Sequence, residues 1–325
     1  MANLYSTIYD ILGVVFGPIM GFIYDFTRNY GVAIILFTVF CRLLMLPSAF
    51  SQQKGQAKNA RMQFKMRKIQ ERYKDDRQRL QQEQQEFYRR EGYNPMSAGC
   101  SGGMLLQFPI IFGLIAAIYR PLKYAVRVPM ELLNLLAEKA PQILVDAGVE
   151  KSVQSSGTYL QLRIVQHLQL FKDLDLVQGG TDWFVKIQQF AQSFKFLGLD
   201  LGTTPNESKG IYYLIPVLAG VSSMLTSLYT FFRQRRTNPG EKQNMAMMGC
   251  TVLGMPLFSA FISLNFPVGI GIYWVVSSLA AFVQVVVLSY THPPQKMLAK
   301  VLVEETIARR SRERGLKRQD AGAGV

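Results

Sequence analysis

A single arginine, Arg42, stands inside an apolar run that is nearly long enough to cross a membrane, residues 31–47 with the sequence GVAIILFTVFCRLLMLP. A helix of about 20 apolar residues crosses a bilayer, and roughly 17 is the short end of the range. An arginine near the middle of such a helix costs at least about 2.5–3.5 kcal/mol. One interpretation is that the side chain reaches the lipid headgroups, since Pro47 follows five residues later, about 7.5 Å along a helix. The other is that the guanidinium faces a wet interior, where it can bind a polar or anionic group.

Hydroxyl side chains at helical spacing supply the polar face that such an interior would need. In the apolar run 211–232, Ser or Thr occurs at i, i+3, i+4 and i+7, which places four hydroxyls on one side of a helix. In lipid, Ser and Thr commonly bond to their own backbone or pack helices closely, which explains most of them singly. A guanidinium has five donors to satisfy, however, and a shared polar cavity would satisfy them. The predicted groove residues are Arg42, Gln107, Ser223, Thr226, Ser227, Thr230 and Ser278, and the other polar residues of the runs are Thr251, Ser259, Ser263, Ser277 and Gln284.

No residue pattern of an enzyme or a metal site accompanies this polar face. The sequence holds no Walker loop, no HExxH and no Ser/His/Asp set, and the apolar runs from residue 31 onward contain neither a carboxylate nor a histidine. Cys41, Cys100 and Cys250 lie in or beside apolar runs at wide spacing and are predicted to be small buried residues. His167 is predicted to be a packed or surface histidine, because no Cys or second His accompanies it. No enzymatic activity, cofactor or metal is therefore expected.

Five apolar runs predict an all-α integral membrane protein. Of the 325 residues 49% are apolar, and the net charge of +14 indicates an anionic partner, either lipid headgroups or nucleic acid. Pro109, Pro216 and Pro256 each interrupt the backbone hydrogen bonds of a span, which fits bent helices around a cavity. The expected transmembrane helices are at 31–50, 97–120 and 211–233, with a tightly joined pair at 245–290. The expected external segments are the N-terminal segment with an interfacial helix at 1–30 and an extracytoplasmic helical region at 121–210. The expected cytoplasmic segments are a basic hairpin at 51–96, a loop at 234–244 and a basic tail at 291–325.

The distribution of charge sets the expected orientation. Residues 48–96 hold twelve Lys/Arg against six acidic residues, and residues 291–325 hold eight against four, whereas 121–210 holds nine of each sign. Because Lys and Arg are enriched in cytoplasmic loops, the basic segments are predicted to be cytoplasmic. The N-terminus is then outside and the C-terminus inside. A bacterial plasma membrane is expected, since neither a cleaved signal peptide nor a transit peptide is evident.

Helical periodicity organises the segments outside the spans. Residues 52–91 contain no Pro and one Gly, and their apolar positions predict two antiparallel helices that turn near 74–76. The run 4–24 contains Asp10 and a break at Gly17-Pro18, which favours an interfacial helix over a sixth span. In the region 121–210, helices are expected at 131–140, 159–174 and 182–197.

Motifs spread over 30–290 resemble the YidC/Oxa family of membrane protein insertases. They are NYGVAIILFTVFCRLLMLP followed by a basic hairpin with YKDD at its turn, YNPMSAGC leading to LLQFPIIFGL, FLGLDL before the third span, and FPVGIGIYWVVSSLAAFVQ at the end. The chain departs from the family pattern where Cys100 is not followed shortly by Pro, and where Ser278 stands in place of a frequent Asn. No large extra external domain is seen, so the resemblance is to the Gram-positive type, although 130–195 is longer than expected.

The resemblance implies a function for Arg42. The arginine would lie in a hydrophilic groove that receives nascent membrane proteins and releases them into the bilayer without nucleotide hydrolysis, alone or with the Sec translocon. A polar or acidic tail would pair with Arg42 by charge-assisted hydrogen bonds while its apolar helix enters lipid. The basic tail is expected to contact ribosomal RNA or anionic lipid through Arg309, Arg310, Arg312, Arg314, Lys317 and Arg318.

Two alternatives from other classes remain at this stage. A small channel or transporter would use the polar face of the third span and would conduct solutes, although the lack of intramembrane acids counts against it. A scaffold that tethers ribosomes would depend on the hairpin and the tail but not on Arg42.

Overall fold

The computed structural model describes residues 2–91, 102–150, 159–208, 210–237 and 250–291, with single positions between 293 and 313. The described chain is mostly helical, and its strands are limited to two short hairpins, which confirms the all-α membrane class. The chain divides into two compact units. Unit 1 comprises 1–44, 106–231 and 243–282, and unit 2 comprises 45–105, 232–242 and 283–325.

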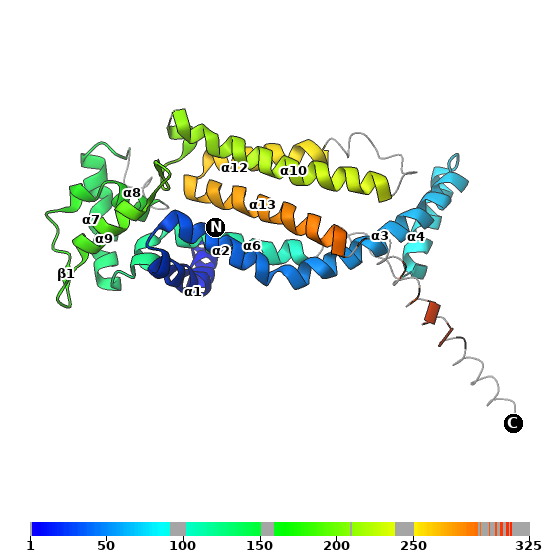
Figure 1. Ribbon diagram of the computed structural model, residues 1–325, viewed down its shortest axis with the longest axis horizontal. Coiled ribbons are helices and arrows are strands. Elements are labelled where there is room, and N and C mark those ends of the chain that lie inside the picture. Colours follow the sequence, from blue (N-terminus) through cyan, green and yellow to red (C-terminus); the bar gives the residue numbers. More distant parts are fainter. Residues whose placement is uncertain are drawn as a thin grey trace, which may run out of the picture. The chain divides into compact units, whose positions relative to one another are not determined.

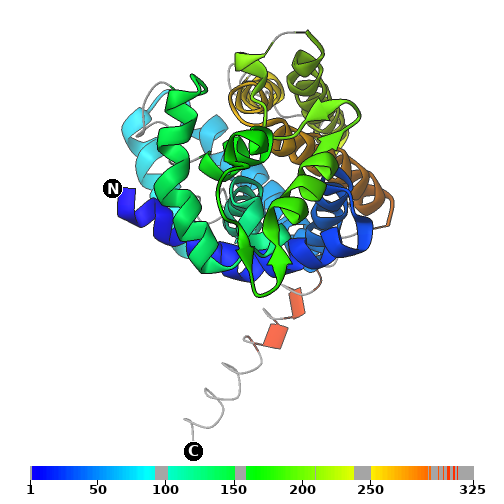
Figure 2. The same ribbon diagram turned by 90° about the vertical axis from the view of Figure 1, so that its left-hand side faces the viewer.

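Apolar helices form the main body of unit 1. Of these, α10 (Leu214–Thr237) and α13 (Val268–Thr291) are long and apolar enough to cross a membrane, and α2 (Tyr30–Leu44) with the start of α3 would make a third span. Helices α6 (Gly102–Tyr119) and α12 (Met255–Asn265) have shorter apolar described segments, and α12 follows a π-helical turn, η5 (Cys250–Gly254). The expected count of five spans therefore stays a prediction. Two views show α10, α12 and α13 grouped together (Figure 1 and Figure 2).

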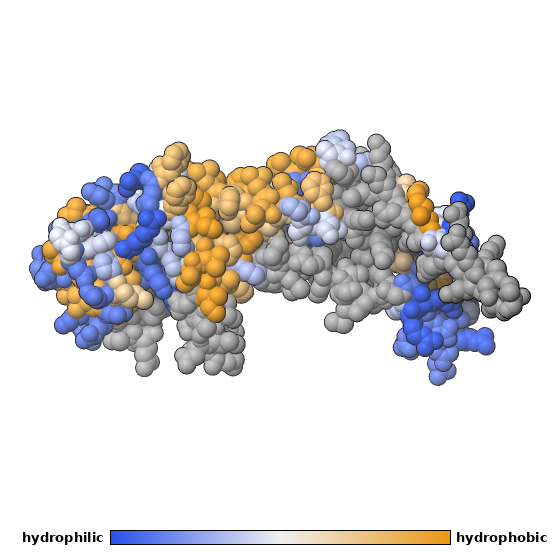
Figure 3. Space-filling model, turned by 90° about the horizontal axis from the view of Figure 1, so that it is seen from below, coloured by the Kyte–Doolittle hydropathy of each residue, from blue (hydrophilic) through white to orange (hydrophobic). Residues whose placement is uncertain are grey.

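The outward faces of these helices are apolar. Leu257 and Phe261 of α12 are 67% and 64% exposed, and Val217 of α10 is 58% exposed. Figure 3 shows a hydrophobic surface beside the more hydrophilic left-hand part, where the residues between α6 and α10 lie. Contiguous apolar surface of this kind is unfavourable in water and favourable against lipid. The helices thus present a surface suited to a bilayer.

The N-terminal helix α1 (Ala2–Thr27) is continuous through Pro18, so the break expected at Gly17-Pro18 is wrong. Proline removes one backbone hydrogen bond from a helix. Close packing around Pro18 offsets that loss, because the side chain of Tyr124 lies against Gly13 and Gly17 before the proline and its backbone carbonyl lies against Gly21 after it. A Cβ on Gly13 or Gly17 would lie 2.1 Å from this side chain. The helix ends at Thr27, and Arg28, with a φ of 52°, turns the chain toward α2.

Residues 122–208, here called the inter-span domain, fold between α6 and α10. Its fully buried side chains include Leu136, Leu144 and Phe171. The third expected helix ends at Ser193 rather than 197, because the chain turns there into a β-hairpin. The elements are η1 (Leu122–Val126), α7 (Met130–Asp146), α8 (Leu160–Gln166), η2 (Leu168–Phe171), the hairpin β1 (Val177–Gln178) and β2 (Thr181–Asp182), α9 (Trp183–Ser193), the hairpin β3 (Lys195–Phe196) and β4 (Leu199–Asp200), and η3 (Pro205–Glu207), after which η4 (Gly210–Tyr213) leads into α10.

Unit 2 contains a helical hairpin made of α3 (Leu46–Arg72) and α4 (Arg77–Glu91). The turn lies at 73–76, where Asp76 accepts a hydrogen bond from the backbone of Arg79. A small core of Met62, Met66 and Phe87 joins the two helices. An ion pair of 2.5 Å between Lys65 Nζ and Glu91 also joins them. The expected boundary regions 92–101 and 238–249 lie outside the described residues.

Candidate functional site

The guanidinium of Arg42 contacts α13. Arg42 lies in the last turn of α2, and its Nε and Nη2 donate hydrogen bonds of 3.2 and 2.5 Å to Ser277 Oγ. Ser277 is buried, with 5% of its surface exposed, and Arg42 is partly buried. Within the described part of the chain, these bonds leave both N–H groups of Nη1 without a protein acceptor. The arginine is therefore held against α13 through the Nε and Nη2 side of its guanidinium.

Thr226 joins the predicted hydroxyl face of α10 to α13 by a hydrogen bond. Thr226 Oγ1 donates to the backbone carbonyl of Ser278 at 3.3 Å, next to the residue that binds Arg42. Thr230 is exposed and donates to the carbonyl of Thr226 in its own helix at 2.8 Å. Ser223 and Ser227 are partly buried. The structure thus brings Arg42 and Thr226 to adjacent residues of α13.

Ser277 supplies the side chain that binds Arg42; it is the neighbour of the predicted groove residue Ser278, whose place in the groove stays a prediction. Neighbouring residues on a helix point about 100° apart, so only one of the two can face α2. The sequence places both in the span and does not distinguish them. Gln107 lies in α6, but its side chain is outside the described residues.

A second polar contact joins α13 to α12. Trp274 Nε1 donates to Ser259 Oγ at 3.2 Å, and this hydroxyl donates to the carbonyl of Met255 at 2.9 Å. Residues 274–278 of α13 therefore make polar contacts with α2, α10 and α12.

Most of the basic tail residues that were predicted to contact RNA or lipid lie outside the residues that the structure describes. Arg310 is exposed and helical. Arg309, Arg312, Arg314, Lys317 and Arg318 lie outside the described residues. Among the residues that are described, no cluster of three or more His, Cys, Asp or Glu is arranged to hold a metal.

His167 lies in the inter-span domain between α8 and η2, and it is partly buried. Burial and the nearby Arg163 guanidinium hold the pKa of His167 below its ordinary value of 6.5, although Asp200 and Glu150 act in the opposite direction. The histidine is therefore neutral near pH 7 and resists protonation in the folded state.

We expect the free energy of unfolding to fall as the pH drops below about 6.5, because the unfolded chain then binds a proton at His167 that the folded protein still excludes. The fall ends below the lowered pKa, where both states are protonated. His167→Gln should remove this part of the pH dependence. Thermal unfolding in detergent between about pH 7.5 and pH 5 would measure it, with the same change at His292 as the control. Parallel pH profiles for wild type and His167→Gln would contradict the expectation.

Comparison with known proteins finds a family model, described as "60Kd inner membrane protein", that matches residues 22–295. The match includes both Arg42 and Ser277. The membrane protein insertase YidC of Syntrophus aciditrophicus is 25% identical over 265 residues, which are 81% of this chain and 33% of that protein. The membrane protein insertase MisCA of Bacillus subtilis is 26% identical over 260 residues, which are 79% of this chain and 69% of that protein. YidC of Brucella suis is 42% identical over 101 residues, which are 31% of this chain and 16% of that protein. The chain therefore aligns with about one third of the Syntrophus protein and with a larger share of the Bacillus protein.

Proposed function

Since the chain belongs to the 60Kd inner membrane protein (YidC/Oxa) family, we propose that it is a membrane protein insertase and chaperone rather than an enzyme. It receives nascent membrane proteins in a hydrophilic groove and releases them into the bilayer, with no nucleotide hydrolysis. The observation that carries this proposal is the contact between Arg42 and buried Ser277, which keeps a guanidinium on the α2–α13 interface.

The proposed mechanism depends on the donors that Arg42 retains. A short acidic or polar tail of the substrate accepts hydrogen bonds from the guanidinium, at a depth where unpaired polar groups cost several kcal/mol. The apolar segment that follows the tail partitions into lipid and draws the substrate out of the groove. Thr226 and Ser277 support the groove through α13, and Gln107, Ser223, Ser227, Thr230 and Ser278 are its other proposed residues.

The proposed orientation places unit 2 at the cytoplasmic side. The α3–α4 hairpin and the tail are rich in Lys and Arg, which favours the cytoplasm. The N-terminus would be outside and the C-terminus inside. The hairpin would guide substrates to the groove, and the tail would contact ribosomal RNA or anionic lipid, with the Sec translocon as a further partner.

Site-specific photocrosslinking to a stalled nascent chain tests the proposal. A photoreactive residue at position 223, a predicted groove position that is partly buried on α10, should crosslink to the substrate, and one at Leu257, which is 67% exposed on α12, should not. Vesicles containing only this protein should also insert a small one- or two-span substrate. Solute flux without insertion would favour a channel. Loss of function on removal of 295–325 together with the hairpin, while Arg42→Ala stays active, would favour a ribosome scaffold.

A further inference from the structure

The inter-span domain contacts the first turn of α13, the helix that carries Ser277. The backbone N–H groups of Val268 and Gly269 donate to the carbonyls of Thr203 and Leu201, both at 2.9 Å. The first N–H groups of a helix have no acceptor inside the helix, and the two carbonyls of the loop supply acceptors for two of them. The approach is close, because a Cβ on Gly269 would lie 3.4 Å from the Leu201 carbonyl oxygen. The beginning of α13 is therefore fixed to the loop at 200–207.

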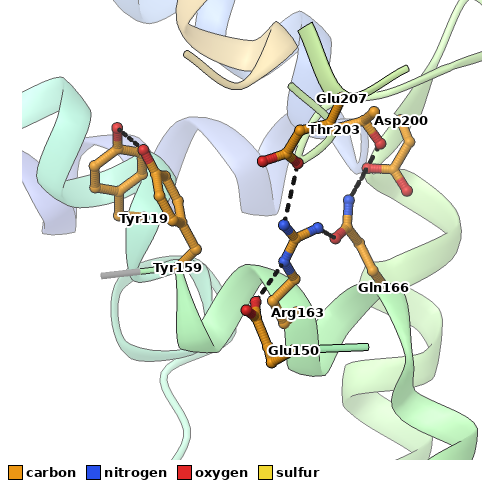
Figure 4. Close-up of polar contacts among 8 residues, drawn as sticks. All are labelled: Tyr119, Glu150, Tyr159, Arg163, Gln166, Asp200, Thr203 and Glu207. Carbon is orange, nitrogen blue, oxygen red and sulfur yellow. Dashed lines mark hydrogen bonds and ion pairs between the residues drawn. The ribbon is translucent and has the colours of Figure 1, made fainter. Parts of the chain in front are cut away.

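Two side chains of α8 hold that loop in place (Figure 4). Gln166 Nε2 donates to Asp200 Oδ1 at 3.1 Å and to Thr203 Oγ1 at 3.3 Å. Arg163 pairs with Glu207 at 3.2 Å, and its Nη1 donates to Gln166 Oε1 at 3.3 Å. Arg163 thus binds the far end of the loop and also orients the amide that binds its near end.

A second anchor of Arg163 ties this arrangement to the body of the domain. Its Nε lies 3.1 Å from a carboxylate oxygen of Glu150, whose side chain is 13% exposed, whereas Glu207 is 59% exposed. A partly buried ion pair is less screened by water than a surface one. Arg163 therefore links the 200–207 loop to the body of the domain.

The same domain also holds the first turn of α2, the helix that carries Arg42. Tyr30 stacks on Phe194, the residue that follows α9, with ring centroids 5.4 Å apart, and meets Phe190 of α9 edge-on at 5.2 Å. Phe196 of β3 packs directly on Gly31, where a Cβ would lie 2.3 Å from its ring. One domain therefore fixes the beginnings of both helices whose side chains form the candidate site.

We propose that the inter-span domain is a clamp for the groove, with Arg163 and Gln166 as positioning residues that keep Ser277 against Arg42. Ser277 lies nine residues beyond Val268, about 13.5 Å along α13, so a tilt of about 5° where the loop holds this helix moves Ser277 by roughly 1.2 Å. A displacement of that size breaks a hydrogen bond of ordinary length. The inference rests on the proposed insertase function and assigns a role in it to the long segment between α6 and α10.

The test measures the insertion of two substrates, one with an acidic tail and one with an uncharged tail, and the hydrogen–deuterium exchange of α13. Arg163→Ala and Gln166→Leu should reduce insertion of a substrate with an acidic tail by roughly tenfold and leave a substrate with an uncharged tail unchanged. Hydrogen–deuterium exchange should become faster in the first turn of α13. Arg163→Lys should restore part of the activity, and Lys172→Ala, an exposed change in the same domain, should alter neither measurement.

The outcomes separate the clamp from simple destabilisation. The clamp would be overturned if the variants inserted both substrates equally poorly, or if the exchange rate at 268–272 stayed unchanged. A positioning role requires that insertion of the acidic substrate falls selectively and that exchange in the first turn of α13 becomes faster. If the wild-type protein inserted neither substrate, the proposed function would fail. The exchange data would still decide in that case whether Arg163 and Gln166 hold the first turn of α13.

Discussion

Arg42→Ala is expected to lower insertion of a substrate with an acidic translocated tail by roughly 10- to 150-fold. Hydrogen bonds to a charged group contribute about 1.5–3 kcal/mol, and removal of the guanidinium takes them away together with the charge. Arg42→Lys should retain part of the activity, because an ammonium keeps the charge but cannot bind a carboxylate through two parallel bonds. Protease protection of the translocated tail in reconstituted vesicles would measure both effects.

A matched control for Arg42 is available at the turn between α1 and α2. Arg28 is an exposed arginine with a φ of 52°, and asparagine tolerates this backbone conformation. Arg28→Asn therefore removes one positive charge from unit 1 without touching α13, and it should leave insertion unchanged. Wild-type activity in Arg42→Ala would remove the guanidinium from the mechanism. Equal losses in the two variants would attribute the effect to net charge.

The sequence predicts that Arg42 needs polar neighbours, but it does not identify which ones it has. The cost of an arginine in an apolar helix and the four hydroxyls on one face of 211–232 both follow from spacing. The choice of Ser277 over Ser278 depends on how α13 is rotated against its neighbours. That rotation is set by contacts such as Gly271 against Ile215, where an added Cβ would lie 2.4 Å from the isoleucine. Such a contact joins residues far apart in the chain and leaves no periodic signal.

The same limit applies to the inter-span domain. Its helical content follows from apolar periodicity, but the β3–β4 hairpin does not, because the turn uses Leu197 with a φ of 51° before Gly198. Leucine rarely adopts this conformation, so the local sequence gives little sign of a turn there. Packing of Phe196 on Gly31 and the bond from Gly269 to Leu201 hold the hairpin. Tertiary contacts therefore override the local preference.

Tyr30→Ala is expected to destabilise unit 1 by about 3–5 kcal/mol, the usual cost of removing a buried aromatic side chain. Tyr30 is fully buried and contacts three rings, those of Tyr24, Phe190 and Phe194. Its hydroxyl donates to the carbonyl of Ala117 in α6 at 2.9 Å. Tyr30→Phe keeps the rings and loses only this bond, so it should cost about 1 kcal/mol. Thermal or denaturant unfolding in detergent would rank the variants.

Tyr290 supplies the control for this comparison, since it is a tyrosine of α13 with 79% of its surface exposed. Tyr290→Ala should leave the unfolding temperature near that of the wild type, because little contact area is lost. Unfolding of Tyr30→Ala at the wild-type temperature would show that the aromatic cluster does not hold α2 to α9. The cluster attaches the inter-span domain to α2, and Tyr30→Phe should preserve that attachment because the rings stay in place. It should therefore also preserve insertion, which separates the role of the ring from that of the hydroxyl.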